Sequence, residues 1–170
     1  MHKSALLFSL LCCLVLTASC IGDKVYNSYY IVTDAKWTQK DTLHFSIPQV
    51  SEDGIYENYI GIRLTDKYPY ASLTLKVKQQ FFPTEITKSK IAKCTFVDEH
   101  GIFNGVGVGL YEYMFLVNTV KLNKGDSIQV DICHILKTDT IPQITEIGYI
   151  LQKQSDDVSS IRSTAKATEP

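Results

Sequence analysis

The chain has 170 residues, and its 17 basic and 18 acidic side chains give a formal net charge of −1. This balance excludes the broad basic surface that nucleic-acid binding requires, so we expect no nucleic-acid partner. Ten Tyr and seven Phe against two Met favour a β-rich domain. The length suits a single domain of ordinary size.

The chain begins with the pattern of a bacterial export signal. Lys3 provides the positive start, residues 5–16 form an apolar run, and Ala18 is one of the small residues before Cys20. We predict a lipoprotein signal peptide that is cleaved before Cys20, whose thiol is then acylated. The apolar run is shorter than the about 20 residues that span a bilayer. The alternative is an ordinary secretory peptide cleaved near Ala18, because Thr17 stands where a lipoprotein signal usually has Leu.

Acylation of Cys20 would anchor the chain at a membrane, since two or more acyl chains hold a protein there stably. We expect a location in the bacterial cell envelope. The segment after the cysteine contains one acid, Asp23, and no acidic cluster of the kind associated with surface export, so we expect the domain to face the periplasm. The last segment contains almost no bulky apolar residues and is predicted to be disordered. The expected segments are a signal peptide over 1–19, a lipidated tether and first strand over 20–36, a folded domain over 37–153 and a tail over 154–170.

The folded segment alternates apolar and polar side chains, as half-buried strands do. The runs 56–65 and 73–77 are joined by a short connection that contains Pro69, and together they predict a hairpin. Residues 84–89 are polar and are predicted as a loop. Seven to nine strands without a helical period favour an all-β fold, an antiparallel β-sandwich of jelly-roll type. The expected strands lie within 43–47, 56–65, 73–77, 91–97, 110–122, 128–136 and 145–151.

The sequence carries no pattern of a catalytic or metal site, so we predict no enzymatic activity, no metal and no cofactor. It has no Gly-x-Ser-x-Gly, and His44, His100 and His134 stand at no metal-ligand spacing. The phase of its strand places His44 on a polar face and His134 among core positions, where a hydrogen-bonded core role is favoured. The Gly-rich segment 103–109 lacks the strand and helix of a nucleotide-binding fingerprint and predicts a flexible loop or a bulged strand entry.

Two further sets of residues leave alternatives open. Cys94 and Cys133 either form a disulfide, which compartments outside the cytoplasm permit, or remain two buried free thiols. Several aromatic residues either stack on a sugar from an exposed position or pack in the core. These aromatic candidates are Trp37, Tyr68, Tyr70, Tyr111 and Tyr113.

An ordered set of weak motifs runs through the chain. It consists of Cys20, Trp37 before a strand, the Arg-x-x-x-x-Tyr-Pro-Tyr stretch 63–70, the Gly-x-Gly-x-Gly segment 105–109, and a strand with His134 that leads to Thr-Glu-Ile-Gly at 145–148. Over about residues 37–151 the chain thereby resembles the GldH-like family of gliding-motility lipoproteins. The resemblance implies an envelope lipoprotein of gliding bacteria and their non-gliding relatives. The resemblance further implies association with the gliding machinery, which is shared with a protein-secretion system. The implied partners are other envelope lipoproteins or membrane proteins. Only Cys20 transfers as a defined functional residue, and no catalytic residue does.

We therefore expect a membrane-anchored, non-catalytic structural or assembly component. The alternative is a carbohydrate-binding lipoprotein of a nutrient-uptake system. The resemblance also implies O-glycosylation as a modification, because an Asp-Ser/Thr-apolar tripeptide accepts O-linked glycans on exported proteins of this bacterial group. The tripeptide occurs at Thr42, Ser127 and Thr140, and each case also fits a plain junction between a turn and a strand.

Overall fold

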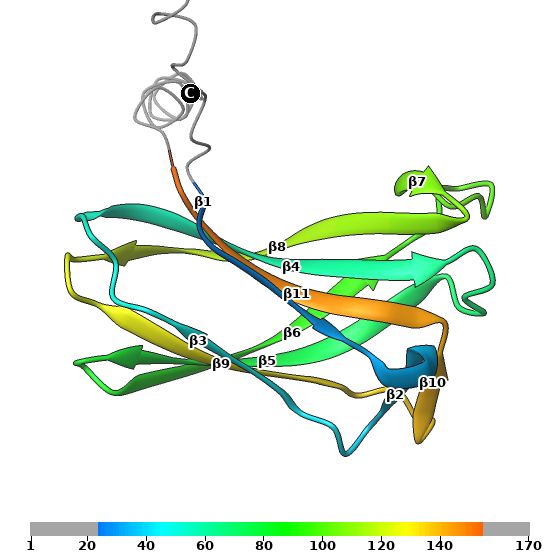
Figure 1. Ribbon diagram of the computed structural model, residues 1–170, viewed down its shortest axis with the longest axis horizontal. Helices are drawn as coiled ribbons and strands as arrows, with labels where there is room; N and C mark the ends of the chain where they lie inside the picture. Colours follow the sequence, from blue (N-terminus) through cyan, green and yellow to red (C-terminus); the bar gives the residue numbers. More distant parts are fainter. Residues whose placement is uncertain (1–23, 155–170) are drawn as a thin grey trace, which may run out of the picture.

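The computed structural model describes residues 24–154, which form a β-sandwich domain (Figure 1). The all-β prediction is confirmed, since this part of the chain contains strands and one short 3-10 helix, η1 (Thr33–Ala35). The predicted signal peptide, Cys20 and residues 155–170 of the predicted tail lie outside the described residues. The strands are β1 (Lys24–Ile31), β2 (Lys36–Thr38), β3 (Leu43–Ile47), β4 (Gly54–Thr65), β5 (Ser72–Phe82), β6 (Ile86–Thr95), β7 (Val106–Val108), β8 (Leu110–Leu122), β9 (Ser127–His134), β10 (Thr140–Pro142) and β11 (Ile144–Lys153).

The strands form two packed sheets with a jelly-roll order. One sheet has the order β1-β11-β4-β8-β7, and the other has the order β3-β9-β5-β6. A small ribbon of β10 and β2 lies beside them. When the short strands β2, β7 and β10 are set aside, the connections pass between the sheets at every step except β5 to β6. This interleaving is the double Greek key of a jelly roll, so the predicted fold type is confirmed.

The core lies between the two sheets and is built from alternate residues of each strand. Strand β4 shows the rule: every second residue from Tyr56 to Leu64 is buried between the sheets, while the residues that alternate with them face the other side of the sheet. The opposing sheet contributes Leu75 and Ile132, both fully buried. Burial of apolar surface at about 25 cal/mol per Å² is the main source of stability for such a sandwich.

Four polar side chains inside the sandwich form a connected hydrogen-bond network. Gln79 of β5 donates to the hydroxyl of Tyr149 (2.6 Å), which donates to Asn58 Oδ1 (2.6 Å). Asn118 of β8 donates to Gln79 Oε1 at 2.7 Å. Buried polar groups of this kind are tolerated only when they are satisfied. The network links β5 of one sheet to β4, β8 and β11 of the other and thereby fixes their alignment.

The predicted hairpin between 56–65 and 73–77 is wrong. Strands β4 and β5 lie in different sheets, where β4 pairs with β8 and β11 while β5 pairs with β6 and β9. An alternating pattern shows which face of a strand is buried, but it does not identify the strand's partner. A short connection serves equally well to cross the about 10 Å between two packed sheets.

The predicted loop at 84–89 is also partly wrong, because β6 begins at Ile86. This strand lies at the edge of its sheet and pairs with β5 along its whole length, from Ile86 opposite Phe81 to Thr95 opposite Ser72. Most of its side chains are exposed, so its sequence is polar although its backbone is fully in the sheet. Edge strands commonly carry lysines, which oppose pairing with further chains.

Cys94 and Cys133 are free thiols on opposite faces of one sheet. Cys94 lies opposite Leu73 and is buried, whereas Cys133 lies opposite Lys76 and is half-buried. Strand β5 separates their strands, β6 and β9. Of the two alternatives left open by the sequence, the structure has the free thiols, and burial raises the pKa of Cys94 to about 12.

Candidate functional site

A stripe of exposed aliphatic side chains runs along β7 and β8. Because β7 pairs antiparallel with β8, Val108 lies opposite Leu110 and Val106 lies opposite Glu112, all on one face of the sheet. Soluble proteins rarely expose large contiguous apolar patches unless a partner covers them. The β7–β8 stripe consists of Val106 (81% exposed), Val108 (98%), Leu110 (45%), Met114 (44%) and Leu116 (49%).

The Gly-rich segment makes this stripe possible by forming a tight return into β8. Gly107 has φ +130°, and a Cβ there would lie 2.1 Å from the backbone oxygen of Leu110. Gly109 has φ +72°, a conformation that side chains disfavour. The segment is followed by strand β8 and not by a helix, so it is a strand entry, one of the two forms that the sequence predicts.

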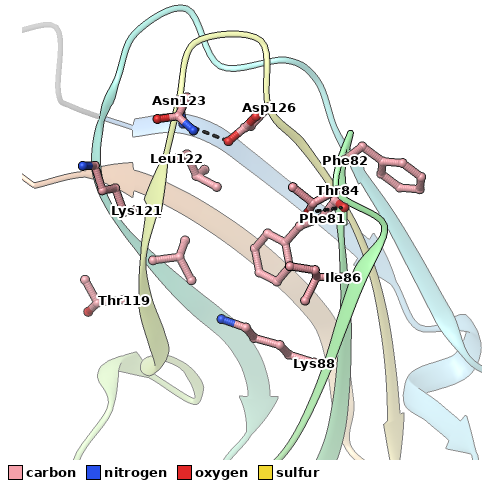
Figure 2. A pocket seen from close by; sticks show the side chains of 11 residues that line it. Phe81, Phe82, Thr84, Ile86, Lys88, Thr119, Lys121, Leu122, Asn123 and Asp126 are labelled. Atoms are coloured by element: carbon pink, nitrogen blue, oxygen red, sulfur yellow. Dashed lines mark hydrogen bonds between the residues drawn. The ribbon is translucent and has the colours of Figure 1, made fainter.

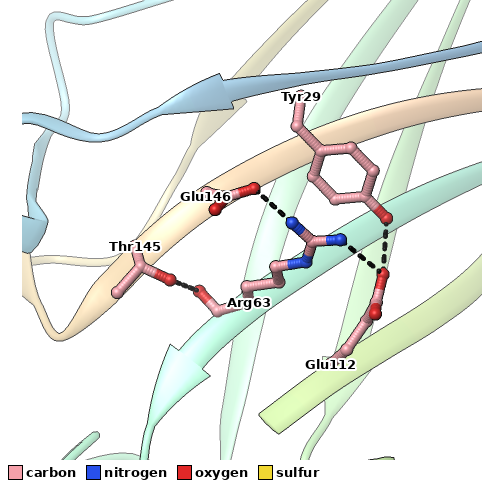
Figure 3. Close-up of polar contacts among 5 residues, drawn as sticks. All are labelled: Tyr29, Arg63, Glu112, Thr145 and Glu146. Carbon is pink, nitrogen blue, oxygen red and sulfur yellow. Dashed lines mark hydrogen bonds and ion pairs between the residues drawn. The ribbon is translucent and has the colours of Figure 1, made fainter. Parts of the chain in front are cut away.

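A charged cluster lies on the same face of the sheet, next to the stripe (Figure 3). Arg63 of β4 pairs with Glu146 of β11 at 2.6 Å and with Glu112 of β8 at 3.4 Å. Tyr29 of β1 donates its hydroxyl hydrogen to Glu112 at 3.0 Å, and the Arg63 guanidinium lies 4.4 Å from the centre of the Tyr29 ring. We call Tyr29, Arg63, Glu112 and Glu146 the Arg63 cluster.

Two glycines leave room for the Tyr29 ring to lie across the sheet. A Cβ at Gly61 would lie 2.2 Å from the Tyr29 hydroxyl oxygen, and one at Gly148 would lie 2.6 Å from the ring. The side chain therefore crosses β11 and β4 and reaches β8. Burial, followed by the hydrogen bond to Glu112, raises the pKa of Tyr29 to about 12, so the phenol remains a neutral donor at pH 7. The cluster ties the first strand to the strand that carries the stripe.

A pocket of about 330 Å³ opens at the opposite end of β8 (Figure 2). It lies between the end of β8 and the turn from β5 to β6. Phe81, Ile86 and Leu122 form apolar walls, and Lys88 directs its ammonium group into the space between the strands. The Lys88 Nζ atom lies 5.5 Å from the centre of the Phe81 ring. We call this space the Lys88 pocket.

Sequence reasoning missed both the Arg63 cluster and the Lys88 pocket. The pocket was hidden by the predicted loop at 84–89, since only pairing of β6 with β5 brings Lys88 beside Phe81. The sequence gives a weak indication of the Arg63 cluster, because Gly61 and Gly148 stand within strands whose other positions mostly carry larger side chains. That signal does not identify Tyr29 as the residue that fills the space.

The aromatic residues proposed for sugar stacking are mostly inside the domain. Trp37 is 1% exposed and donates its indole N–H to the Asp41 carbonyl at 2.9 Å, and Tyr68 is 4% exposed with its ring edge-on to Phe96. Trp37 in β2 and Tyr68 in the connection between β4 and β5 are both buried, so neither is accessible to a ligand. Tyr113 is buried and Tyr111 is half-buried. Tyr70 alone among the five is exposed, beside a groove that Ser72 and Thr138 help to line.

The proposed glycosylation residues all lie at the ends of loops. Thr42 is exposed just before β3, while Ser127 and Thr140 are half-buried first residues of β9 and β10. These positions fit the junctions between turns and strands that the sequence indicates. Their modification stays a prediction.

The histidines take up separate positions. His44 is exposed and pairs with Asp131 at 2.7 Å, as its polar-face phase predicts. His134 is buried, as its phase predicts, but its ring nitrogens have no hydrogen-bond partner among the described residues. Burial lowers its pKa. Within residues 24–154 no group of three His, Cys, Asp or Glu side chains is placed to hold a metal ion, and no helix is long and apolar enough to cross a membrane.

The fold places the chain among all-β jelly-roll domains, and the sequence profile of one family then matches nearly all of this domain. The profile is that of the GldH lipoprotein, and it covers residues 24–151. The chain belongs to this family. A curated relative, the gliding motility lipoprotein GldH homolog of Christiangramia forsetii, is 21% identical over 165 residues, covering 92% of this chain and all of the relative. The family is described as a lipoprotein, which implies a lipid-anchored envelope location.

Solved structures with a similar arrangement come from varied proteins. A carbohydrate-binding module specific for non-crystalline cellulose is 8% identical with a TM-score of 0.42, over 76% of this chain and 73% of the module. The mosquito-larvicidal Cry4Aa toxin of Bacillus thuringiensis is 11% identical with a TM-score of 0.42. That match covers 75% of this chain but 24% of the toxin.

Proposed function

We propose that this protein is a non-catalytic assembly component of the gliding and secretion machinery. It is held at a membrane of the cell envelope by acylated Cys20 and faces the periplasm. Membership of the GldH lipoprotein family supports the association with gliding motility. The exposed β7–β8 stripe supports a role in assembly, because such a surface is stable in water mainly when another protein covers it.

The placement of the stripe supports this role further. Strand pairing puts Lys24, at the start of β1, in one row with Gln152, Glu57 and Thr119. Leu110 lies nine residues further along β8 from Thr119, about 30 Å away at strand spacing. In Figure 1, β7 is at the right end of the domain and the turn between β8 and β9 is at the left end. A domain tethered through β1 thus presents the outer part of its stripe away from the tether.

The experiment is a pull-down from detergent-solubilised membranes of cells that carry the tagged full-length protein. We expect recovery of gliding or secretion components with the unchanged protein, and loss of most of that recovery with Val108→Asp and Leu116→Asp combined. The control is Ile91→Asp, since Ile91 is also exposed but lies on the outer face of the other sheet. Equal recovery with all three proteins would contradict the proposed role of the stripe.

A second candidate function, sugar binding in a nutrient-uptake system, is favoured by the exposed ring of Tyr70 beside its groove. Aromatic rings on such surfaces stack against the apolar faces of sugars. The candidate now rests on this one ring, because Trp37 and Tyr68 are buried. Glycan-array binding that disappears in Tyr70→Ala and persists in Tyr30→Ala would support it, whereas absence of binding to any glycan would remove it.

A further inference from the structure

We propose that the Lys88 pocket binds the headgroup of an anionic phospholipid in the membrane that holds the anchor. The inference rests on the proposed acylation of Cys20. It assigns to the domain a second membrane contact, made by the folded protein itself and separate from the covalent lipid.

Strand register places the pocket near the tether. Lys24 and Thr119 lie in the same row of the sheet, three strands apart, which is about 14 Å at the usual spacing. Thr119 lines the pocket. Residues 21–23 alone separate Cys20 from Lys24, and an extended chain of that length reaches at most about 14 Å. The end of the domain that contains the pocket is therefore held close to the membrane surface.

The chemistry of the pocket suits a phosphate attached to an apolar group. Lys88 and Lys121 both line it, and neither forms an ion pair with a residue in the part of the chain that the structure describes. The next inward lysine, Lys90, is already occupied, because its ammonium donates to the Val117 carbonyl. Phe81 and Leu122 supply an apolar wall beside the Lys88 ammonium. A cation beside an apolar wall matches the junction between a lipid phosphate and its glycerol and acyl part.

The acids around this end are mostly engaged by the protein itself. The carboxylate of Asp126, which lines the pocket, accepts the backbone N–H of Asn123 at 2.8 Å. Asp53 accepts the backbone N–H of Lys124 at 2.7 Å, and Glu52 pairs with Lys153. These contacts leave the ammonium groups of Lys88 and Lys121 available to an incoming anion.

The two strands beside the pocket add to the positive electrostatic potential around it. Strands β5 and β6 with their turn, residues 72–95, contain five lysines and one acid, Glu85. Ile55 and Ile86 are exposed at this end and provide apolar side chains that can enter the interfacial layer of a bilayer. An acidic protein segment would use the same lysines, but the short tether favours the lipid surface.

The test measures co-sedimentation of the chain from residue 20 to 170, carrying Cys20→Ser so that no covalent lipid contributes. The vesicles are phosphatidylcholine alone or phosphatidylcholine mixed with phosphatidylglycerol. We expect binding to the mixed vesicles only, weakened by added salt and not abolished by excess inorganic phosphate. Lys88→Glu should lower the partition coefficient at least about fivefold, the factor for one lysine near an anionic surface.

The matched control is Lys93→Glu, which changes the net charge equally on the outer face of β6 and should retain most of the binding. Lys121→Glu provides a second pocket variant if Lys88→Glu alters thermal unfolding. The proposal would be overturned if the pocket and control variants lost vesicle binding equally, or if neither pocket variant lost binding. It would also be overturned if inorganic phosphate displaced the protein from the vesicles, or if the unchanged protein did not bind them. Fatty-acid labelling of the full-length protein tests the anchor separately, so a failure of one is distinguishable from a failure of the other.

Discussion

At the scale of single residues, His134 is the side chain within residues 24–154 whose buried polar atoms lack hydrogen-bond partners. Its ring lies 5.3 Å from the Trp37 ring, edge to face, and its nitrogens have no partner among the described residues. A buried polar group without a partner costs about 1–3 kcal/mol. The sequence predicts the burial of this side chain from its phase in β9. It cannot predict whether the ring nitrogens find hydrogen-bond partners, because that depends on side chains from other strands.

His134→Leu should raise the free energy of unfolding by about 1 kcal/mol at pH 8, because the unsatisfied nitrogens are removed. The difference from the unchanged protein should grow as the pH falls below 6.5. The folded pKa of His134 is lowered by burial, so below 6.5 the unfolded chain takes up a proton more readily and the folded state loses stability. Urea denaturation across this pH range measures the effect. The exposed His100, changed to Leu, is the control, and a parallel pH dependence in both variants would contradict the prediction.

At the scale of elements, the attachment of strand β1 to its sheet is reinforced by the side chain of Tyr29, which lies across the neighbouring strands β11 and β4. Tyr29 fits only because Gly61 and Gly148 lack side chains beneath it. Sequence patterns predict long strands of this sheet well, since the alternation in β4 follows directly from one buried face. They do not predict partners: the β4–β5 pairing is wrong, and the contact from β1 to β8 joins residues 83 positions apart.

Gly61→Ala should lower the free energy of unfolding by about 1–3 kcal/mol, because the new methyl group overlaps the Tyr29 phenol. In a Tyr29→Ala background the same change should be neutral or stabilise by about 0.5 kcal/mol, as a glycine to alanine change does where space allows. Urea denaturation of the four proteins gives the coupling energy. Additive effects within about 0.5 kcal/mol would show that the ring does not occupy this space in solution.

At the scale of the whole molecule, the domain presents different chemistry at its two ends. The Lys88 pocket and the start of β1 lie toward one end, and the outer part of the β7–β8 stripe lies toward the other. Composition and alternation predict the sandwich and its jelly-roll type, because one buried face per strand leaves few other solutions. They cannot predict the Lys88 pocket, which forms where the turn from β5 to β6 meets the end of β8, or the pairing that places the exposed side chains of β7 and β8 on one face.

Cys20→Ala should abolish fatty-acid labelling of the full-length protein and release it from membranes, since no second acylation site precedes the domain in the predicted mature chain. Metabolic labelling followed by membrane fractionation measures both effects. Cys133→Ala is the control, because this thiol lies in β9 within the folded domain and its loss should leave labelling unchanged. Persistent labelling of the Cys20 variant would contradict the proposed anchor.

The Tyr29 contact also has a mechanical consequence. A force on the proposed tether would enter the domain at Lys24, and β1 is an edge strand that pairs only with β11 among the described strands. Such a strand peels away when its hydrogen bonds break one after another. The Tyr29 hydroxyl, bonded to Glu112 three strands away, carries part of that load directly to β8. Traction on the proposed anchor would thereby be shared across the width of the sheet and would reach the strand that bears the exposed aliphatic stripe.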